Sequence, residues 1–221
     1  MVLTGNTCYL LTGNTPVKGV RDQKTMTAAK LEISEKLPPR DRIIAAARDL
    51  FYRHGIRAVG VDAIAEAAGT NKMTLYRHFE SKDALVAEYL RGLAAEKRGV
   101  WSDVEAAHPG DPRAQLEAWL VEAARNVSDP KSRGCALANA AVELPEKEHP
   151  ARCVIEQCKQ DSRDQLVALC RRAGAAQPEL LADQLFMLFE GALVCTQSTG
   201  HAGPACNFIE AGRAIVAAHL R

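Results

Sequence analysis

Five side chains that can donate hydrogen bonds fall within one short segment, residues 72–78. They are Lys72, Thr74, Tyr76, Arg77 and His78. Side chains of these types hydrogen-bond to phosphate oxygens and to base edges, and a short helix that carries them fits the major groove of DNA. The sequence holds no phosphate-binding loop, dinucleotide fingerprint or H-E-x-x-H metal motif. We therefore expect binding chemistry rather than catalysis, with no metal ion and no cofactor.

Two short helices separated by a turn are predicted to position this segment. Gly69 lies in the turn, and the second helix spans about 72–79 with Asn71 as its N-cap. The apolar residues expected to face inward are Ile64, Ala65, Ala68, Leu75 and Phe79. The outward face of the second helix then consists of Lys72, Met73, Thr74, Tyr76, Arg77 and His78. This pair of helices is typical of a helix-turn-helix motif.

The remaining sequence also predicts helices. Apolar residues recur with a period of 3.6 between Asp41 and Gly55, and a further helix begins after the cap residue Ser81 and reaches about Trp101. The segment His108–Pro112 interrupts this pattern. Beyond it we expect helices at about 113–127, 134–144, 149–173, 178–199 and 205–220. No alternation typical of β-strands competes, so the predicted fold class is all-α with about nine helices.

Three regions are expected along the chain. The pentapeptide Leu3–Thr7 recurs as Leu11–Thr15 in a stretch without helical periodicity, which predicts a disordered arm. A second explanation for this stretch is that synthesis begins at Met26. The regions are the arm at 1–37, a DNA-binding domain at 38–98 with its motif at 60–79, and a second helical domain at 99–221.

Charge is distributed unevenly between the two predicted domains. Lys and Arg outnumber Asp and Glu by 12 to 8 over residues 36–100, whereas over 101–221 they are outnumbered by 16 to 12. A basic part joined to an acidic part is typical of a nucleic-acid-binding module attached to a second module. No apolar run approaches the ~18 residues of a membrane span, and no signal peptide is evident, so we expect a cytoplasmic protein.

The segments Arg42–Gly55, Val61–Phe79 and Ser81–Leu85 resemble the N-terminal domain of the tetracycline-repressor (TetR) family, with Thr74–Phe79 followed by Lys82 as the most diagnostic run. The resemblance implies that Tyr76 and Lys82 contact phosphates, that Thr74 and His78 reach the backbone or bases, and that Lys72 and Met73 read the operator. The sequence departs from the family pattern at Gly60, where a capping Ser or Thr is common, and at Asp62, where a basic DNA contact can lie. These departures concern the first helix of the motif and leave the second intact.

The resemblance also implies that the last two helices pair with those of a second copy. An apolar stripe on the predicted helix 178–199 surrounds Gly191, where a glycine would permit another helix to approach closely. The candidate dimer-interface residues are Leu181, Leu185, Leu188, Gly191, Ala192, Phe208 and Ile215. We expect a homodimer bound to a palindromic operator on double-stranded DNA.

A pocket for a small apolar ligand is implied among the helices of the second domain. The ligand would release a repressor from its operator. The candidate wall residues are Trp101, Trp119, Leu120, Leu137, Val142, Ile155, Phe186, Met187 and Phe189. Each of them also suits an ordinary apolar core.

Two alternatives share this architecture. In the first, the second domain only dimerises and DNA binding is constitutive. In the second, the protein senses oxidants through Cys153, Cys158 or Cys170. At 100° per residue these three cysteines lie on different faces of the predicted helix 149–173, so a disulfide within that helix is not expected, whereas a bridge to another helix is possible.

Overall fold

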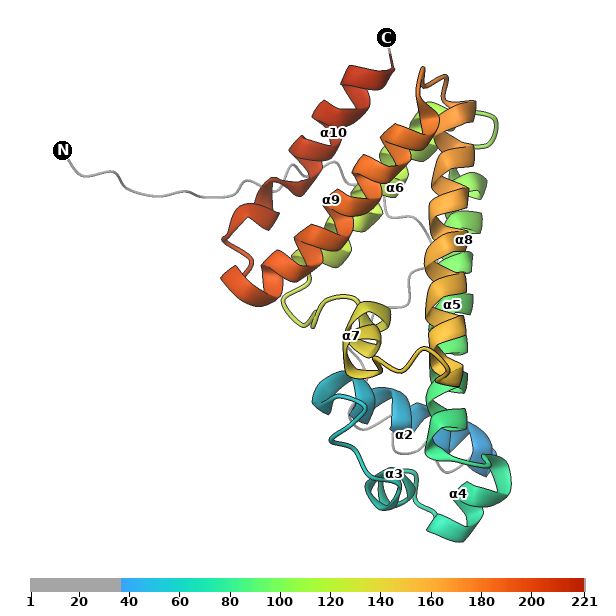
Figure 1. Ribbon diagram of the computed structural model, residues 1–221. Coiled ribbons are helices and arrows are strands. Elements are labelled where there is room, and N and C mark those ends of the chain that lie inside the picture. Colours follow the sequence, from blue (N-terminus) through green and yellow to red (C-terminus); the bar gives the residue numbers. More distant parts are fainter. Residues whose placement is uncertain (1–36, 221) are drawn as a thin grey trace, which may run out of the picture.

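The computed structural model of the protein describes residues 37–220 and is helical throughout (Figure 1). The predicted arm, with its repeat and Met26, lies outside the described residues except for Leu37. The described part contains α2 (Pro39–His54), α3 (Val61–Ala67), α4 (Lys72–His78), α5 (Lys82–Ala107), α6 (Pro112–Ser128), α7 (Ala136–Glu143), α8 (Pro150–Arg172), α9 (Pro178–Thr199), a 3-10 helix η1 (Pro204–Asn207) and α10 (Phe208–His219). No strand occurs between residues 37 and 220, which confirms the all-α prediction.

Local capping explains where several helices begin. The Asn71 side chain accepts a hydrogen bond from the Thr74 amide, and the Ser81 hydroxyl accepts one from the Ala84 amide. Each bond satisfies one of the amide groups that the first turn of a helix leaves without a partner. Both predicted caps are thereby confirmed. At the start of α3, Gly60 makes no side-chain cap, in agreement with its expected departure from the family pattern.

The C-terminal helix is shorter than predicted. Residues 204–207 form the 3-10 helix η1, and α10 begins only at Phe208. Asn207, the last residue of η1, has backbone angles of φ −91° and ψ 10°, which lie outside the α-helical region, so α10 starts only after it. Periodicity over 205–220 could not reveal this break, because a 3-10 turn and an α-helical turn place apolar residues at similar spacings.

Helices α2, α3 and α4 form a small three-helix unit at one end of the molecule (Figure 1). Ile43 of α2, Ile64 of α3 and Leu75 of α4 are fully buried where these helices meet. Phe79, directly after α4, is also buried. The packing of α3 against α4 that the sequence predicts is therefore confirmed.

Helix α5 joins this unit to the larger helical body formed by α6–α10. Its 26 residues correspond to a length of about 39 Å. It begins beside α4 and runs along α8 (Figure 1), crossing the predicted domain boundary at residues 98 and 99. One rigid element therefore belongs to both predicted domains.

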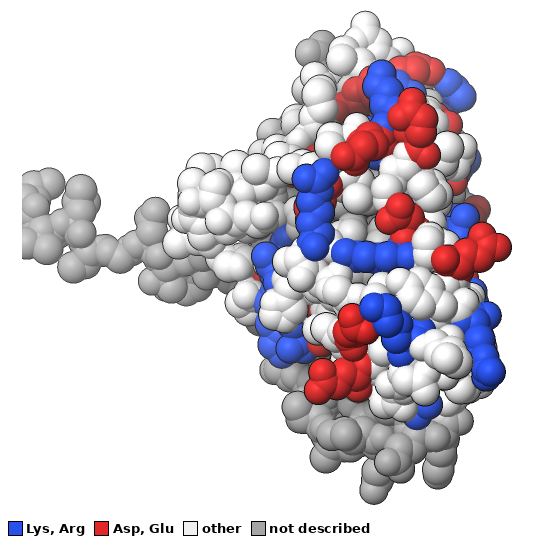
Figure 2. All heavy atoms as spheres, turned by 60° about the horizontal axis from the view of Figure 1, so that its bottom comes forward, with Lys and Arg blue, Asp and Glu red and all other residues white. Residues whose placement is uncertain are grey.

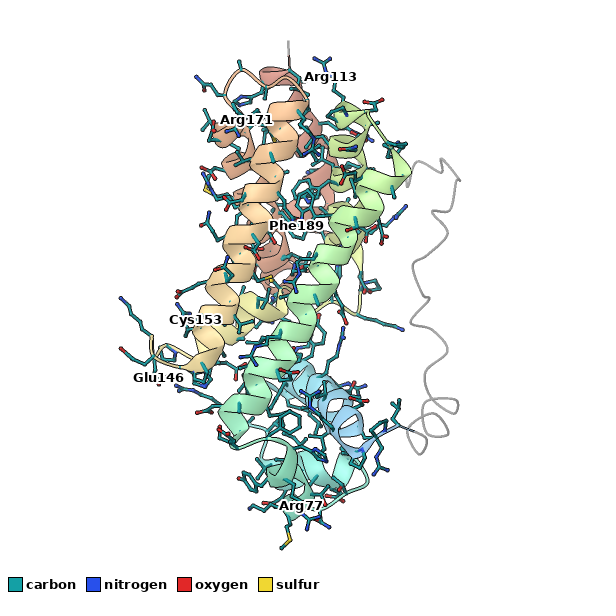
Figure 3. The ribbon with its side chains drawn as sticks, turned by 90° about the vertical axis from the view of Figure 1, so that its right-hand side faces the viewer. Arg77, Arg113, Glu146, Cys153, Arg171 and Phe189 are labelled. Atoms are coloured by element: carbon teal, nitrogen blue, oxygen red, sulfur yellow. The ribbon has the colours of Figure 1, made fainter. Side chains whose placement is uncertain are left out.

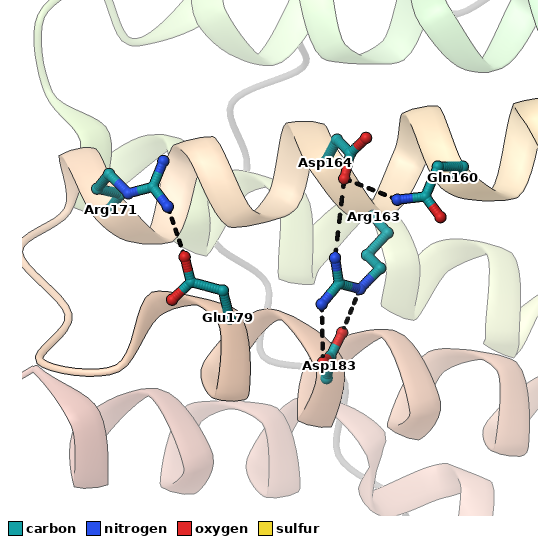
Figure 4. Close-up of polar contacts among 6 residues, drawn as sticks. All are labelled: Gln160, Arg163, Asp164, Arg171, Glu179 and Asp183. Carbon is teal, nitrogen blue, oxygen red and sulfur yellow. Dashed lines mark hydrogen bonds and ion pairs between the residues drawn. The ribbon is translucent and has the colours of Figure 1, made fainter.

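Ion pairs connect α8 to α9 within the body (Figure 4). Arg163 forms two hydrogen bonds with the Asp183 carboxylate at 2.6 and 2.9 Å, and Arg171 binds Glu179 at 2.5 Å. The Arg163 guanidinium lowers the pKa of Asp183. None of the helices within residues 37–220 is long and apolar enough to cross a membrane.

Candidate DNA-binding interface

Helix α4 presents most of the predicted DNA-binding side chains on one exposed face. Leu75 and Phe79 anchor it to the three-helix unit, so the other side of the helix faces solvent. Met73 is 71% exposed despite being apolar, and Tyr76 is also exposed. Arg77 lies at the free end of the molecule, far from the body (Figure 3). The structure thus brings Lys72, Met73, Tyr76, Arg77 and His78 to one surface, with Thr74 half-buried beside them.

Lys72 has a partner that the sequence did not reveal. Its ammonium lies 3.2 Å from the carboxylate of Asp62 on α3. Both side chains are more than half exposed, so the pair contributes little to stability. It does place a negative charge beside the predicted base-reading lysine.

Lys82 points toward the protein in this structure. Its Nζ donates a hydrogen bond of 2.6 Å to the carbonyl oxygen of Ile56, in the loop after α2. Partial burial lowers the pKa of this ammonium, against the opposing effect of Asp83 and Glu143. The side chain therefore connects the start of α5 to that loop, a contact across 26 residues that no sequence pattern signals.

Two arginines of α2 are used for structure. Arg40 forms an ion pair with Glu88 of α5 at 2.6 Å, and its guanidinium lies over the Phe79 ring. Arg48 forms a bidentate ion pair with the Glu96 carboxylate. Figure 2 looks toward the end that carries α3 and α4, and basic side chains on the face in view lie between acidic ones. The positive excess of this region is therefore partly neutralised by ion pairs.

Polar contacts also join the three-helix unit to α7. The backbone amide of Arg133 donates to the Tyr52 hydroxyl at 2.7 Å, and the Arg133 guanidinium donates to the Tyr52 carbonyl oxygen at 3.1 Å. The Arg57 amide donates to the Glu143 carboxylate at 2.9 Å. We call this contact between residues 51–57 and 133–143 the α2–α7 junction. Its partners are more than 80 residues apart, and sequence reasoning missed it.

The predicted ligand-pocket residues form a closed aromatic and aliphatic core in this structure. Trp101 stacks on Trp119 with ring centroids 6.2 Å apart, and Phe189 lies 6.0 Å from both Trp119 and Phe208. Figure 3 shows Phe189 among the helices of the body. The side chains that complete this apolar region, or pack against it, are Leu120, Leu137, Ile155 and Phe186. Two predictions are wrong: Val142 is 83% exposed and Met187 is 64% exposed, so neither lies in the core.

The predicted dimer-interface residues divide into two groups. Leu181, Leu185, Ala192 and Phe208 are buried within the protomer, so they have no surface left for a partner, and their assignment is wrong. Gly191 is exposed, and Leu188 and Ile215 are half-buried. Predicting the wrong face of α9 has a physical reason, because this helix is apolar on two sides. Its outer apolar residues, which the sequence analysis did not select for the interface, are Leu180, Met187 and Val194.

The thiols of α8 differ in reactivity. Burial raises the pKa of Cys158, and it raises the pKa of Cys170 to about 12. Because the thiolate is the reactive form of cysteine, these two side chains are poor targets for oxidants at neutral pH. Of the three cysteines in the oxidant-sensing alternative, only Cys153 is exposed.

Comparison with protein families gives a match to the bacterial regulatory proteins of the tetR family over residues 43–89, which include α3 and α4. The sequence is 39% identical over 90 residues to the HTH-type transcriptional repressor KstR2 of Rhodococcus jostii. That match covers 41% of this chain and 44% of the relative, so the chain spans less than half the length of this curated relative.

Solved structures match over a larger part of the chain. A TetR transcriptional regulator from Streptomyces avermitilis is 31% identical, with a TM-score of 0.65, over 80% of this chain and 99% of that protein. A TetR-family regulator from Streptomyces coelicolor is 26% identical, with a TM-score of 0.78, over 83% of this chain and 96% of that one. The similarity therefore includes the body as well as the three-helix unit.

Proposed function

The chain belongs to the TetR family of DNA-binding transcriptional regulators, which are not enzymes, and we propose that it is a homodimeric repressor released from a palindromic operator by a small apolar ligand. The observation that carries this proposal is the exposed face of α4. On this face the side chains of Met73, Tyr76, Arg77 and His78 lie in solvent and take no part in the protein core. The relative KstR2 is itself a repressor, which favours repression over activation. Because its proposed partner is chromosomal DNA, we place its action in the cytoplasm.

In the proposed complex, α4 enters the major groove. Lys72, Met73 and Thr74 lie at the start of the helix, the part that reads bases in helix-turn-helix proteins. Tyr76 and His78 contact phosphates or bases from the following turn. Lys82 contacts a phosphate after releasing the Ile56 carbonyl oxygen.

The proposed dimer uses the outer face of α9 together with α10. Leu180, Met187, Gly191 and Val194 follow one another at intervals of seven, four and three residues, which places them on one side of a helix. Met187 and Val194 are 64% and 59% exposed. A continuous patch of exposed apolar side chains is typical of a surface that binds another protein. A Cβ built on Gly191 meets no atom within 4 Å, so space for a neighbouring helix is present.

The proposed apolar ligand lies among α5–α9, where Trp101, Trp119 and Phe189 pack together. These rings would have to separate to admit it, and the space they leave would favour a displaced α5. Because α5 also carries Lys82 beside the DNA, its displacement would change the spacing of the two α4 helices. A typical coupling of about 1–3 kcal/mol weakens operator binding roughly 5- to 150-fold.

Selection of binding sites from random DNA tests the central claim. We expect an inverted repeat whose half-sites are one helical turn apart, or a multiple of one turn. Enrichment of no inverted repeat would refute the proposal. With the selected operator, a screen of apolar compounds should find one that both stabilises the protein to heat and releases the DNA, with a change in tryptophan fluorescence.

A further inference from the structure

A cavity of about 140 Å³ lies at the α2–α7 junction, outside the aromatic core of the body. Helices α2, α5, α7 and α9 all contribute to its walls. Figure 1 shows α7 between the three-helix unit and the rest of the body, so this cavity lies where the DNA-binding end meets the body. None of the residues predicted to hold a ligand lines it.

The lining of the cavity combines two kinds of side chain. Phe51, Ile56 and Tyr89 are its apolar members, and the Phe51 and Tyr89 rings are tilted at a centroid distance of 5.6 Å. The amides of Asn139 and Gln197 are also part of the lining, and one N–H of Asn139 donates to the Arg133 carbonyl oxygen at 2.7 Å. Burial raises the pKa of Tyr89 to about 12, so its hydroxyl is neutral at physiological pH. The lining therefore suits a molecule with one apolar end and one hydrogen-bonding end.

Charge and volume narrow the class of ligand further. Arg133 and Glu143 contribute one charge of each sign, and both already bind across the junction, to Tyr52 and to the Arg57 amide. A charged ligand would therefore be buried without a free counter-ion, at considerable cost. An apolar cavity of about 150 Å³ accommodates benzene, so the volume here fits a single ring with a small substituent.

We propose that the α2–α7 junction is an effector site for a neutral single-ring molecule that bears one hydroxyl or carbonyl group. Phe51, Ile56 and Tyr89 receive the ring, and the Gln197 amide, together with the second N–H or the carbonyl oxygen of Asn139, binds the polar group. This site is separate from the one proposed among Trp101, Trp119 and Phe189. The regulatory part of the inference rests on the proposed function, because it requires an operator to be released.

The contacts around the cavity explain how an occupant would affect DNA binding. The Tyr52–Arg133 and Arg57–Glu143 hydrogen bonds hold the end of α2 and the following loop on α7. The same loop holds Lys82 through the Ile56 carbonyl oxygen. Gly55 in this loop has φ +86°, and a Cβ there would lie 2.9 Å from the Glu143 carboxylate, so the packing is close. A ligand that separates α2 from α7 moves the three-helix unit, and α4 with it.

Phenol is the probe for this site, with benzene and benzoate as controls for the polar group and for charge. At about ten times its dissociation constant, phenol should raise the melting temperature by about 3–6 °C. Benzene should have a smaller effect, and benzoate none. On the selected operator, phenol should weaken binding about fivefold or more. A crystal structure with phenol should place its ring against Phe51 and Tyr89.

Variants of α7 test the location. Ala136→Leu fills the cavity from its wall and should abolish the phenol-dependent rise in melting temperature; Ala140→Leu provides a second filling variant if the first fails to fold. Val142→Leu, on the exposed side of the same helix, should keep the full response.

The outcomes separate the two proposals. No stabilisation by phenol, or stabilisation that survives a folded cavity-filling variant, overturns the effector site while leaving operator binding intact. If phenol raises the melting temperature and Ala136→Leu abolishes this rise, but phenol does not weaken operator binding by the unsubstituted protein, the regulatory role is overturned. If no inverted repeat is selected but phenol binds as described, the proposed function fails and the binding site stands.

Discussion

Helices α4 and α9 both expose one face to solvent, but the two faces differ in composition. The α4 face is built from Tyr76, Arg77 and His78, together with Met73, around a helix of seven residues. The α9 face is built from apolar side chains such as Met187 and Val194 along 22 residues. Polar side chains of the first kind suit a hydrated, charged partner, and apolar ones suit a partner that removes them from water. Two faces that are both exposed to solvent therefore suit two different kinds of partner.

The largest effect on stability should come from truncating a buried side chain on the inner side of α4. Leu75 is fully buried, so Leu75→Ala should lower the free energy of unfolding by about 2–5 kcal/mol and abolish operator binding. Met73→Ala changes an exposed neighbour and should alter stability by no more than about 0.5 kcal/mol. Urea unfolding of both variants measures the difference. Equal losses would mean that α4 has no distinct inner and outer face.

A pH effect should arise where the DNA-binding end meets the body. The pKa of Tyr89 is about 12 in the folded protein, above its usual value near 10 in an unfolded chain. Stability from this group is therefore complete below pH 10 and lost as the pH rises toward 12, by up to about 2–3 kcal/mol. Tyr89→Phe should remove this dependence in urea titrations at pH 8 and 11. Tyr76→Phe, on the exposed face, should retain it.

A smaller effect should distinguish the α9 face from other exposed surface. Gly191→Leu inserts a large side chain where the partner helix is proposed to lie, and overpacking of about 1–3 kcal/mol raises the dimer dissociation constant roughly 5- to 150-fold. Gly99→Leu is the matched control, because Gly99 is also an exposed helical glycine with no atom near its Cβ position. Analytical ultracentrifugation should find weakened association only for Gly191→Leu. An unaffected dimer would place the interface elsewhere.

The smallest effect concerns charge on the α4 side. Asp62→Asn should free Lys72 for DNA and remove a repulsion toward phosphates, raising operator affinity by about two- to fivefold, since exposed pairs are worth up to about 1 kcal/mol. Lys72→Ala should lower affinity and relax base preference. Binding measured at 50 and 200 mM salt should show a larger benefit of Asp62→Asn at low salt. Lower affinity of this variant would show that Asp62 itself assists recognition.

The two faces also differ in how far the sequence predicts them. Around α4 the signals are local: Asn71 and Ser81 cap helices within three residues of their partners, and Leu75 lies four residues before Phe79. Along α9, periodicity identifies apolar stripes but does not say which one faces the protomer's own core. Leu181 and Leu180 are neighbours in sequence, yet one is buried and the other exposed. Contacts such as Tyr52–Arg133 depend on the path of the whole chain and leave no local pattern.

The construction of α4 has a consequence for how this protein can diverge. Its place in the fold depends on one cap, Asn71, and on two apolar side chains, Leu75 and Phe79. The outward residues contribute little to stability, so they can change one at a time without loss of the native state. Substitutions on this face therefore change what the helix can recognise while leaving the fold intact.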